Sequence, residues 1–407
     1  MFDNDFGEHE EHDIIADMLE DEDIAKPHIL SDMNYLYESF RKSLTDSAWK
    51  SGPQEFELDV LAKLTALSDS LQTHTYKTDP TTEFVLNERG KTRYIHGNTI
   101  KDRVVRHNLC DNILTPAMNK LLIYNNGASQ KGKGISFTRA QFEKHLHNFY
   151  LKHHNNDGYI LLLDFSKFYD NISHAKVKEM FSSMLDTESN WLFDLIIDSF
   201  RTDITHFPQV NPDDKFDSIA FHQLEPDNSV TYLTRYLNKG IDIGDQTSQN
   251  IGVFYATKID KYVTVARGHR WYGRYMDDIY VIHDDLRYLN ETLVGIRDIA
   301  EELGLFINDK KTRICKLSST YKFLQIKYSL QASGRVIRRI NPESVTRERQ
   351  KLKAYKRLAD KKLLQYDAIK QAYKSWICNY HSIMSKKQLS NMQSLYTSLF
   401  SETARYK

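Results

Sequence analysis

The chain has only three cysteines among its 407 residues, and Cys110, Cys315 and Cys378 lie far apart. Their spacing fits neither a disulfide framework nor a zinc site, which favours the reducing cytoplasm. No apolar run approaches the roughly 18 residues that a membrane span needs. The first residues are acidic rather than basic and then apolar, which argues against a secretory signal peptide. These absences predict a cytoplasmic protein with no membrane partner.

Basic residues are missing from the first 25 positions, which hold eleven acidic residues and no Lys or Arg. The formal net charge is zero, but outside this segment 55 basic residues stand against 44 acidic ones. Residues 335–375 are more biased, with thirteen Lys or Arg against four Asp or Glu. A basic body favours a polyanionic partner, although a solvated helix face is the commoner cause of a charge run. We expect residues 1–26 to be a flexible acidic tail, either simply disordered or competing with nucleic acid for the basic surface.

Apolar spacing outlines the elements of the fold. Hydrophobic residues make up 40% of the chain, with 24 Tyr and 20 Phe, which supports a large folded core. Apolar positions three and four residues apart predict helices within 31–75 and over about 101–125. The segment FVLNERGKTRYIHG (84–97) predicts a hairpin, and the apolar run YILLLDF (159–165) predicts a buried strand. A second hairpin is expected over 271–283.

Two further helices carry clear signals at their ends. Ser173 is expected to cap a helix that follows it, because Ser accepts hydrogen bonds from the first helical turn. Residues 286–303 are amphipathic and stop at Gly304, with an apolar stripe of Leu286, Leu289, Leu293, Ile296 and Leu303. The polar stretch 201–235 is expected to be an insertion. From about 343 onward the chain is basic and helical, with aromatic residues that either stack on nucleic acid or pack between helices: Tyr355, Tyr366, Tyr373 and Trp376.

Two Asp-Asp pairs lie seven residues apart in WYGRYMDDIYVIHDD, residues 271–285. Asp284–Asp285 directly precedes the amphipathic helix, and Asp is a preferred N-cap, so a structural role explains this pair. Asp277–Asp278 lies instead at the tip of an apolar hairpin, without the Gly that such a turn favours. A local rule broken in this way is a pointer to function.

Asp164 supplies a third carboxylate at the end of the predicted strand, where the start of a turn is the alternative role. Asp164, Asp277 and Asp278 together make a set that can hold two divalent ions about 3.5–4 Å apart, the arrangement for in-line phosphoryl transfer. Mg²⁺ prefers oxygen ligands and typically takes one or two carboxylates plus substrate phosphates. The sequence therefore predicts a catalytic set of these three aspartates.

The order of the motifs resembles that of the reverse transcriptases. YMDD (275–278) is similar to their YxDD box, and DFSKFYDNISH (164–174) to their first catalytic motif. GIDIGDQTSQN (240–250) resembles their second palm motif, GLFINDKKT (304–312) the fourth, and YKFLQIKY (321–328) the primer-grip motif. The last reads FLQ where the family has FLG, so its loop geometry is expected to differ.

The preceding segments resemble the fingers of the same enzymes. GKTRYI (90–95) is similar to the strands that grip the incoming nucleotide, and DRVVRHNLCDNILTP (102–116) with SQKGKG (129–134) to the bacterial fingers-to-palm segment. The resemblance covers about residues 30–330. The second motif has the form IG-x-x-x-SQ, which is similar to the diversity-generating and defence-associated prokaryotic groups and unlike the QG-x-x-x-SP of retroviral and group II intron enzymes.

The resemblance implies an α+β fold, the right-hand polymerase with fingers, a palm on an antiparallel sheet, and a helical thumb. After the tail, the expected parts are an N-terminal extension with fingers over 27–157, a palm over 158–330, and a basic helical thumb or C-terminal region over 331–407.

The resemblance also assigns roles at the metal and nucleotide sites. Asp164 and Asp277 would bridge two Mg²⁺ ions, with Mn²⁺ as the alternative ion, while Asp278 and the carbonyl of Phe165 would complete the ligands. Tyr169 would be the steric gate that excludes a ribose 2′-hydroxyl, with an ordinary core position as the alternative. Ile243 takes the place of a retroviral Gln beside the nascent base pair, which predicts reduced fidelity.

Further nucleotide-binding candidates are basic or polar. Lys91 and Arg93 alternate on the predicted hairpin, so both would face the incoming triphosphate, or else form a solvated strand edge. Gln249 belongs to the second motif, and Lys311 resembles the lysine that protonates pyrophosphate, with Lys310 as its rival. The candidates for contact with the nucleic-acid backbone are Lys131, Lys133, Arg335, Arg338, Arg339, Lys353 and Lys356.

These features predict an RNA-directed DNA polymerase that uses dNTPs. Its expected partners are an RNA template and a DNA product, with an accessory protein or a second copy of the chain as further candidates. By resemblance, the length and N-terminal extension favour a bacterial antiviral-defence enzyme that copies a structured non-coding RNA. The alternatives are a diversity-generating or retron enzyme, a template-independent or protein-primed polymerase, and a catalytically dead nucleic-acid scaffold. Intact Asp164, Asp277 and Asp278 argue against the scaffold.

Overall fold

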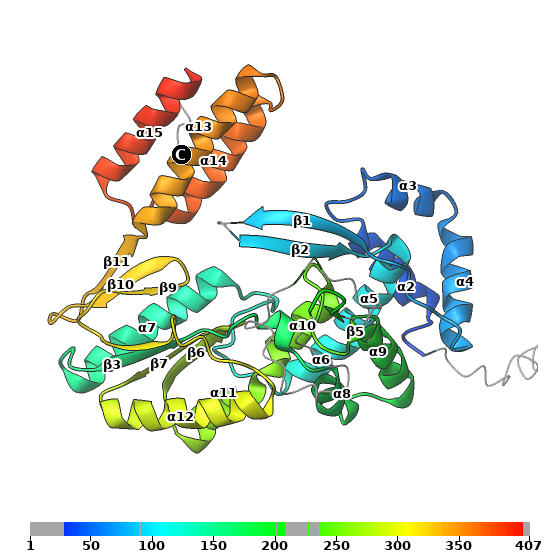
Figure 1. The fold of residues 1–407 in the computed structure, drawn as a ribbon, viewed down its shortest axis with the longest axis horizontal. Coiled ribbons are helices and arrows are strands. Elements are labelled where there is room, and N and C mark those ends of the chain that lie inside the picture. The colour runs from blue at the N-terminus through cyan, green and yellow to red at the C-terminus, as the bar shows by residue number, and fades with distance from the viewer. Residues whose placement is uncertain are drawn as a thin grey trace, which may run out of the picture. The chain divides into compact units, whose positions relative to one another are not determined.

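The computed structural model describes residues 28–88, 91–200, 202–207, 227, 229 and 236–401 (Figure 1). The fold is mixed helix and sheet, 53% helical and 16% strand, as the α+β prediction requires. The predicted tail over 1–26 and most of the predicted insertion over 201–235 lie outside the described residues. The chain divides into two compact units, and each is treated by itself.

The first unit comprises Met1–Pro116, Met184–Ile196 and Gly244–Thr247. Its main elements are α2 (Met33–Ser43), α3 (Ser51–Leu58), α4 (Val60–Gln72), β1 (Thr82–Glu88), β2 (Lys91–Gly97) and α5 (Ile100–Leu109). The β1–β2 pair is antiparallel, which confirms the first predicted hairpin. Asp32 caps α2 and Thr99 caps α5, because each side chain accepts a hydrogen bond from a first-turn N–H.

The helix predicted over about 101–125 is shorter than expected. Helix α5 is followed by a π-helical turn, η1 (Cys110–Leu114), and then by α6 (Thr115–Asn119). The helical run ends with α6. The backbone of residues 125–127 is bonded to a strand instead. Arg274 N–H donates to the Asn125 carbonyl at 3.1 Å, and Gly127 N–H donates to the Arg274 carbonyl at 3.0 Å. These strand contacts satisfy the polar backbone groups that a longer helix would have bonded internally.

A four-stranded antiparallel sheet forms the centre of the second unit, in the order β6-β7-β3-β8. The strands are β3 (Tyr159–Leu163), β6 (Trp271–Tyr275), β7 (Asp278–His283) and β8 (Arg313–Lys316). The predicted buried strand is β3, which pairs with β7 on one side and β8 on the other. The second predicted hairpin is β6–β7. Helix α7 (Ile135–His153) and helix α12 (Leu286–Glu302) lie along opposite faces of this sheet (Figure 1).

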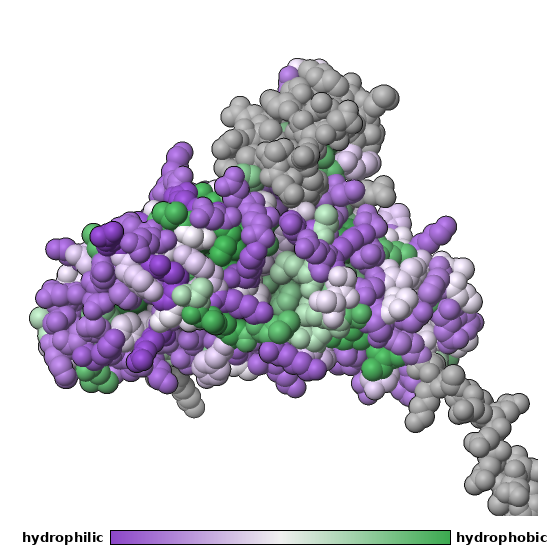
Figure 2. All heavy atoms as spheres, turned by 90° about the horizontal axis from the view of Figure 1, so that it is seen from below, coloured by the Kyte–Doolittle hydropathy of each residue, from purple (hydrophilic) through white to green (hydrophobic). Residues whose placement is uncertain are grey.

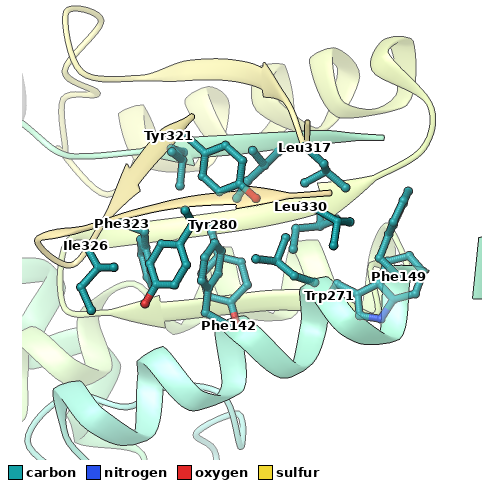
Figure 3. Close-up of a cluster of buried hydrophobic side chains, with 14 of the residues drawn as sticks. Phe142, Phe149, Trp271, Tyr280, Leu317, Tyr321, Phe323, Ile326 and Leu330 are labelled. Carbon is teal, nitrogen blue, oxygen red and sulfur yellow. The ribbon is translucent and has the colours of Figure 1, made fainter. Parts of the chain in front are cut away.

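The core beneath α7 is rich in aromatic rings (Figure 3). Phe142 on α7 contacts Tyr280 on β7 edge to face, with ring centroids 4.7 Å apart. Phe149 meets Trp271 of β6 in a similar way at 5.2 Å. A three-stranded sheet completes this core, in the order β11-β10-β9, made of β9 (Tyr321–Phe323), β10 (Ile326–Leu330) and β11 (Val336–Ile340). These rings fix the sheet from which the candidate catalytic residues extend.

The capping predictions are confirmed. Ser173 accepts a hydrogen bond from Lys176 N–H at the start of α8 (His174–Ser182). Asp285 accepts from two first-turn N–H groups of α12, which makes this aspartate a helix cap. The predicted stripe on α12 was wrong at one position, since Leu286 is 41% exposed while Leu289 and Ile296 are buried. The remaining elements are α9 (Thr187–Ser199), β4 (Thr202–Asp203), β5 (Tyr236–Leu237), α10 (Gln246–Tyr255) and α11 (Thr257–Lys261).

Three helices follow the sheets: α13 (Pro342–Asp360), α14 (Tyr366–Tyr380) and α15 (Lys386–Phe400). They share a core of their own, in which Tyr373 is buried and against which Tyr355 and Trp376 pack. Tyr366 is exposed. Three of the four aromatic residues singled out in the sequence therefore serve helix packing, which settles that alternative for them.

Polar side chains cover most of the face that Figure 2 draws, with smaller apolar areas between them. Within the described part of the chain, no helix combines the length and apolarity required to cross a bilayer.

The turn between β9 and β10 contains the FLQ departure from the family pattern. Leu324 and Gln325 have φ values of 42° and 70°, and they connect the paired residues Phe323 and Ile326. This backbone is the left-handed region, which glycine adopts far more readily than other residues. The guanidinium of Arg139 donates to the Leu324 carbonyl at 3.1 and 2.5 Å and holds the turn in place.

Replacing Gln325 with glycine is therefore expected to raise the free energy of unfolding by about 0.5–1 kcal/mol, since relief of strain exceeds the added entropy of the unfolded chain. Denaturant unfolding measures the change. Lys327→Gly, within ordinary β10 strand, is the matched control and should destabilise by about 0.5–1 kcal/mol. Equal losses in both variants would contradict the strained turn.

Candidate active site

The register of the central sheet brings the three aspartates to one edge. Leu163, the last residue of β3, pairs with Ile279 of β7. One step further along this antiparallel ladder, Asp164 lies across from Asp278, the first residue of β7. Asp277 precedes it in the turn, which joins the paired residues Tyr275 and Asp278. Residues more than a hundred positions apart are thus brought together by strand pairing.

The pKa of Asp278 reflects the charges of the neighbouring carboxylates. Burial, followed by the negative charges of Asp277 and Asp164, raises the pKa of Asp278 to about 7, and Lys311 and Lys322 oppose that rise. Two carboxylates near a third, partly buried one disfavour its charged form unless a cation is present. A cation bound here would therefore stabilise the charged form of Asp278.

Lys311 supplies part of this positive charge. Its Nζ lies 2.5 Å from Asp164 Oδ1, and Asn308 Nδ2 donates to the same oxygen at 3.4 Å. The backbone is joined here as well, since Asn308 N–H donates to the Asp164 carbonyl at 2.9 Å. Of the two lysines left open by the sequence, Lys311 is the one placed at the aspartates.

Tyr169 lies beside the turn that carries Asp277. Tyr169 is the first residue of a short 3-10 turn, η2 (Tyr169–Asn171). Its ring packs against α10 at Gly252. A Cβ placed on Gly252 would lie 3.0 Å from Tyr169 Oη and 3.1 Å from Met276 Sδ. The absence of a side chain at Gly252 therefore lets the Tyr169 ring and the Met276 side chain approach the same spot on α10.

The second motif supplies the start of α10. Ile243 is half-buried in the turn before the helix, and Gln249 is exposed within it. Ser129 Oγ donates to Gln249 Oε1 at 3.3 Å, which ties the Gly-Lys loop to α10. Phe165 is buried next to Asp164, and its strand bridge with Ile307 fixes the backbone there.

The two lysines of the Gly-Lys loop differ. Lys133 Nζ donates to the carbonyls of Tyr124 and Asn126 and to Gln130 Oε1, at 2.9, 3.2 and 2.9 Å. Burial lowers its pKa. This arrangement favours a structural role for Lys133, while Lys131 is exposed at the surface.

The remaining basic candidates occupy several elements. Lys91 and Arg93 lie on β2 of the first unit, where Arg93 is exposed. Arg335, Arg338, Arg339 and Lys353 are exposed at β11 and α13, with Arg338 also 3.5 Å from Glu143. Lys356 pairs with Asp360 at 2.7 Å within α13, so part of its charge is already neutralised.

A divalent ion fits the donor set at the sheet edge. The ligands present are hard carboxylate oxygens, which Mg²⁺ prefers, and the raised pKa of Asp278 shows that a cation would relieve repulsion there. Among the described residues, no group of three or more acidic, His or Cys side chains is placed so that it could hold a metal ion by itself. Substrate phosphates would have to complete the coordination.

Three residues around the turn escaped the sequence analysis. Arg274 is fully buried and paired with Asp260, and Gly252 underlies Tyr169 and Met276. A charged residue within the apolar strand WYGRY was the available signal for Arg274, since a buried charge requires a partner. Nothing in the sequence identified the partner, because it lies on α11.

A family model described as reverse transcriptase (RNA-dependent DNA polymerase) matches residues 77–328, which is more than half of the chain. The match contains all three aspartates, Tyr169, and the segment that brings Lys311 to them. No curated protein matches the chain. Reverse transcriptases generally use divalent metal ions, and their partners are an RNA template, a DNA product and dNTPs. The chain belongs to the reverse transcriptase family and is an RNA-directed DNA polymerase, a nucleotidyltransferase.

Proposed function

We propose that the chain is a right-hand polymerase that adds deoxynucleotides by two-metal phosphoryl transfer at Asp164, Asp277 and Asp278. The observation that supports this most directly is the β3–β7 register, which sets Asp164 across from Asp278 beside the turn carrying Asp277. In this proposal the central sheet is the palm, β1–β2 belongs to the fingers, and the helices from α13 onward form the thumb.

Each side chain has a defined task in this proposal. Asp164, Asp277, Asp278 and the Phe165 carbonyl would hold two Mg²⁺ ions. When bound, such ions lower the pKa of the primer 3′-hydroxyl and stabilise the leaving pyrophosphate. Lys311 Nζ lies beside Asp164, from where it would donate a proton to pyrophosphate. Lys91 and Arg93 would bind the triphosphate, and the exposed basic residues of the Gly-Lys loop, β11 and α13 would contact the backbone of primer and template.

Primer extension on an RNA template tests the proposal. We expect Mg²⁺-dependent incorporation of dNTPs, with Mn²⁺ as a substitute, and little incorporation of NTPs because the Tyr169 ring blocks a 2′-hydroxyl. Reactions without template, and without primer, identify template-independent or protein-primed synthesis. Failure to incorporate any nucleotide with either ion, by protein shown to be folded, would overturn the proposed chemistry.

Ile243 should loosen control of the nascent base pair, because an apolar side chain replaces a hydrogen-bonding amide. Ile243→Gln is therefore expected to lower the error rate several-fold, on the order of 1 kcal/mol of added discrimination. Sequencing of products made on a defined template measures this. Ile243→Leu is the volume-matched control and should keep the parental error rate. An unchanged error rate in Ile243→Gln would exclude the proposed role.

The biological role proposed for this polymerase is antiviral defence in bacteria, with a structured non-coding RNA as template. The IG-x-x-x-SQ form of the second motif is similar to the defence-associated and the diversity-generating groups alike, so the role rests on resemblance and has a diversity-generating element as its alternative. Sequencing the RNA that copurifies with the protein tests it. One abundant structured RNA would support the role, a template repeat would indicate a diversity-generating element, and an RNA covalently joined to DNA would indicate a retron.

A further inference from the structure

Arg274 is the largest fully buried side chain of the described residues, and it lies two positions before the turn that carries Asp277. Its Nε and Nη2 donate to the two carboxylate oxygens of Asp260, at 2.8 and 2.6 Å. Tyr272 Oη donates to the same carboxylate at 2.5 Å. Asp260 and Arg274 are both 0% exposed, so this fork is shielded from water.

The guanidinium has two more contacts, and both are with backbone carbonyls. Nη2 donates to the carbonyl of Val253 on α10 at 2.8 Å, and Nη1 donates to the carbonyl of Met276 at 3.1 Å. One planar group thus joins α11, α10 and the β6–β7 turn. The second of these carbonyls belongs to the peptide that links Met276 to Asp277.

That peptide follows a residue with a costly backbone conformation. Met276 has a φ of 56°, in the left-handed region that side chains other than glycine rarely adopt. A Met at this turn position is retained only when its surroundings determine the conformation, and Nη1 of Arg274 is the contact that reaches its carbonyl. A rotation of this peptide would move Asp277, the residue that directly follows it.

Stability alone is a weak reason for this arrangement. A buried ion pair gives up hydration of both charges, and well-packed apolar residues often replace such pairs without loss of stability. What apolar residues cannot supply is a rigid donor aimed at the Met276 carbonyl. The fork on Asp260 fixes the plane of the guanidinium, and Tyr272 fixes Asp260 in turn.

We propose that Arg274, oriented by Asp260 and Tyr272, is a positioning residue that locks the Met276–Asp277 peptide and so sets the place of Asp277 among the catalytic carboxylates. This inference rests on the proposed two-metal function of those carboxylates. Arg274, Asp260 and Tyr272 would not bind the metal ions themselves. They would fix the backbone of the turn that carries Asp277, as hydrogen-bond partners of ligand residues do in metal sites.

The test separates positioning from packing. The triple variant Tyr272→Phe, Arg274→Met, Asp260→Leu removes the network while keeping much of its volume. We expect a melting temperature close to that of the parent protein. The turnover number should fall about 10–100-fold, with little change in KM for dNTP, and Mn²⁺ binding measured calorimetrically without nucleotide should weaken about 10-fold. Parental turnover and Mn²⁺ affinity in the folded triple variant would overturn the inference.

Arg274→Lys provides a second variant if the triple variant does not fold. Lysine keeps the charge beside Asp260 but lacks the fork, so it cannot hold both Asp260 and the Met276 carbonyl in one plane. We expect the same loss of turnover and of Mn²⁺ affinity with smaller amplitude, and a parental value for both would again overturn the inference.

Two controls separate this inference from the proposed function. Arg267→Met breaks an ion pair with Glu291, and its side-chain partners lie on α12, so turnover and Mn²⁺ affinity should stay at the parental level. The parent protein and Asp277→Ala are measured in parallel. A parent with no metal-dependent synthesis would refute the proposed function. An active parent whose Arg274 variants match it would refute only the positioning role.

Discussion

Asp277→Ala is expected to lower the rate of nucleotide incorporation by at least about 10³-fold while the protein stays folded. A carboxylate that bridges two metal ions stabilises charge that develops in the transition state, and effects of several kcal/mol are usual for such contacts. Loss of Asp277 also removes a negative charge beside Asp278, so repulsion in the site falls. Single-turnover primer extension, with circular dichroism as the check on folding, measures both quantities.

The matched control is Asp285→Ala, from the second Asp-Asp pair in the same stretch. Asp285 accepts hydrogen bonds from Arg287 and Tyr288 N–H, so its loss should cost about 1 kcal/mol of stability and leave incorporation intact. Both variants replace an Asp with Ala, at positions eight residues apart. They differ in that Asp277 lies in the β6–β7 turn and Asp285 caps α12. Similar incorporation rates in Asp277→Ala and in the parent would refute the assignment of Asp277 as a metal ligand.

Asp278→Asn is expected to make the metal-free protein more stable while it removes activity. The pKa of Asp278 in the folded protein is about 7, against 3.8 for an ordinary Asp, so the folded state holds this proton more tightly than the unfolded state does. The free energy of unfolding of the parent should therefore fall as the pH rises from about 4 to about 7, and the full penalty applies above that range. A pKa shift of this size corresponds to about 2–4 kcal/mol of lost stability once Asp278 is ionised. An Asn at this position has no charge and avoids that loss.

Thermal or denaturant unfolding at a series of pH values, with a chelator present, tests this linkage. Asp278→Asn should match the parent near pH 4, exceed it by the full amount near pH 8, and show a flatter pH dependence between them. Mg²⁺ should then stabilise the parent at pH 8 more than the variant, because divalent cations favour the ionised carboxylate. A variant less stable than the parent at pH 8 would contradict the repulsion inferred at the sheet edge.

The sequence predicted the elements of the site better than their contacts. The strand before Asp164 and the hairpin around Asp277–Asp278 follow from local periodicity, and the structure has both. The same local rules assigned Asp285 to a helix cap. Strand order is different, because nothing local shows that β3 pairs with β7 rather than with another strand. The ordered motifs, through their family resemblance, predicted that Asp164 and Asp278 belong together.

Contacts that depend on tertiary packing were missed. Asp260 lies on a short helix and carries no local mark of its pairing with Arg274. Gly252 carries no local mark either, since a glycine in a helical stretch does not by itself indicate a close approach. Leu286 was placed on the apolar stripe because periodicity cannot tell where a helix leaves the core. The helix expected to reach 125 ended earlier because residues 125–127 bond to β6 instead.

The close approach at Gly252 has an evolutionary consequence. Tyr169 Oη and Met276 Sδ would each lie within about 3.1 Å of a Cβ at position 252, so the three residues share one volume. Substitutions among residues in contact do not add in their energetic effects. The replacements tolerated at Tyr169 will therefore depend on the residues at positions 252 and 276. This part of the protein should evolve by epistatic steps in which the order of mutations matters.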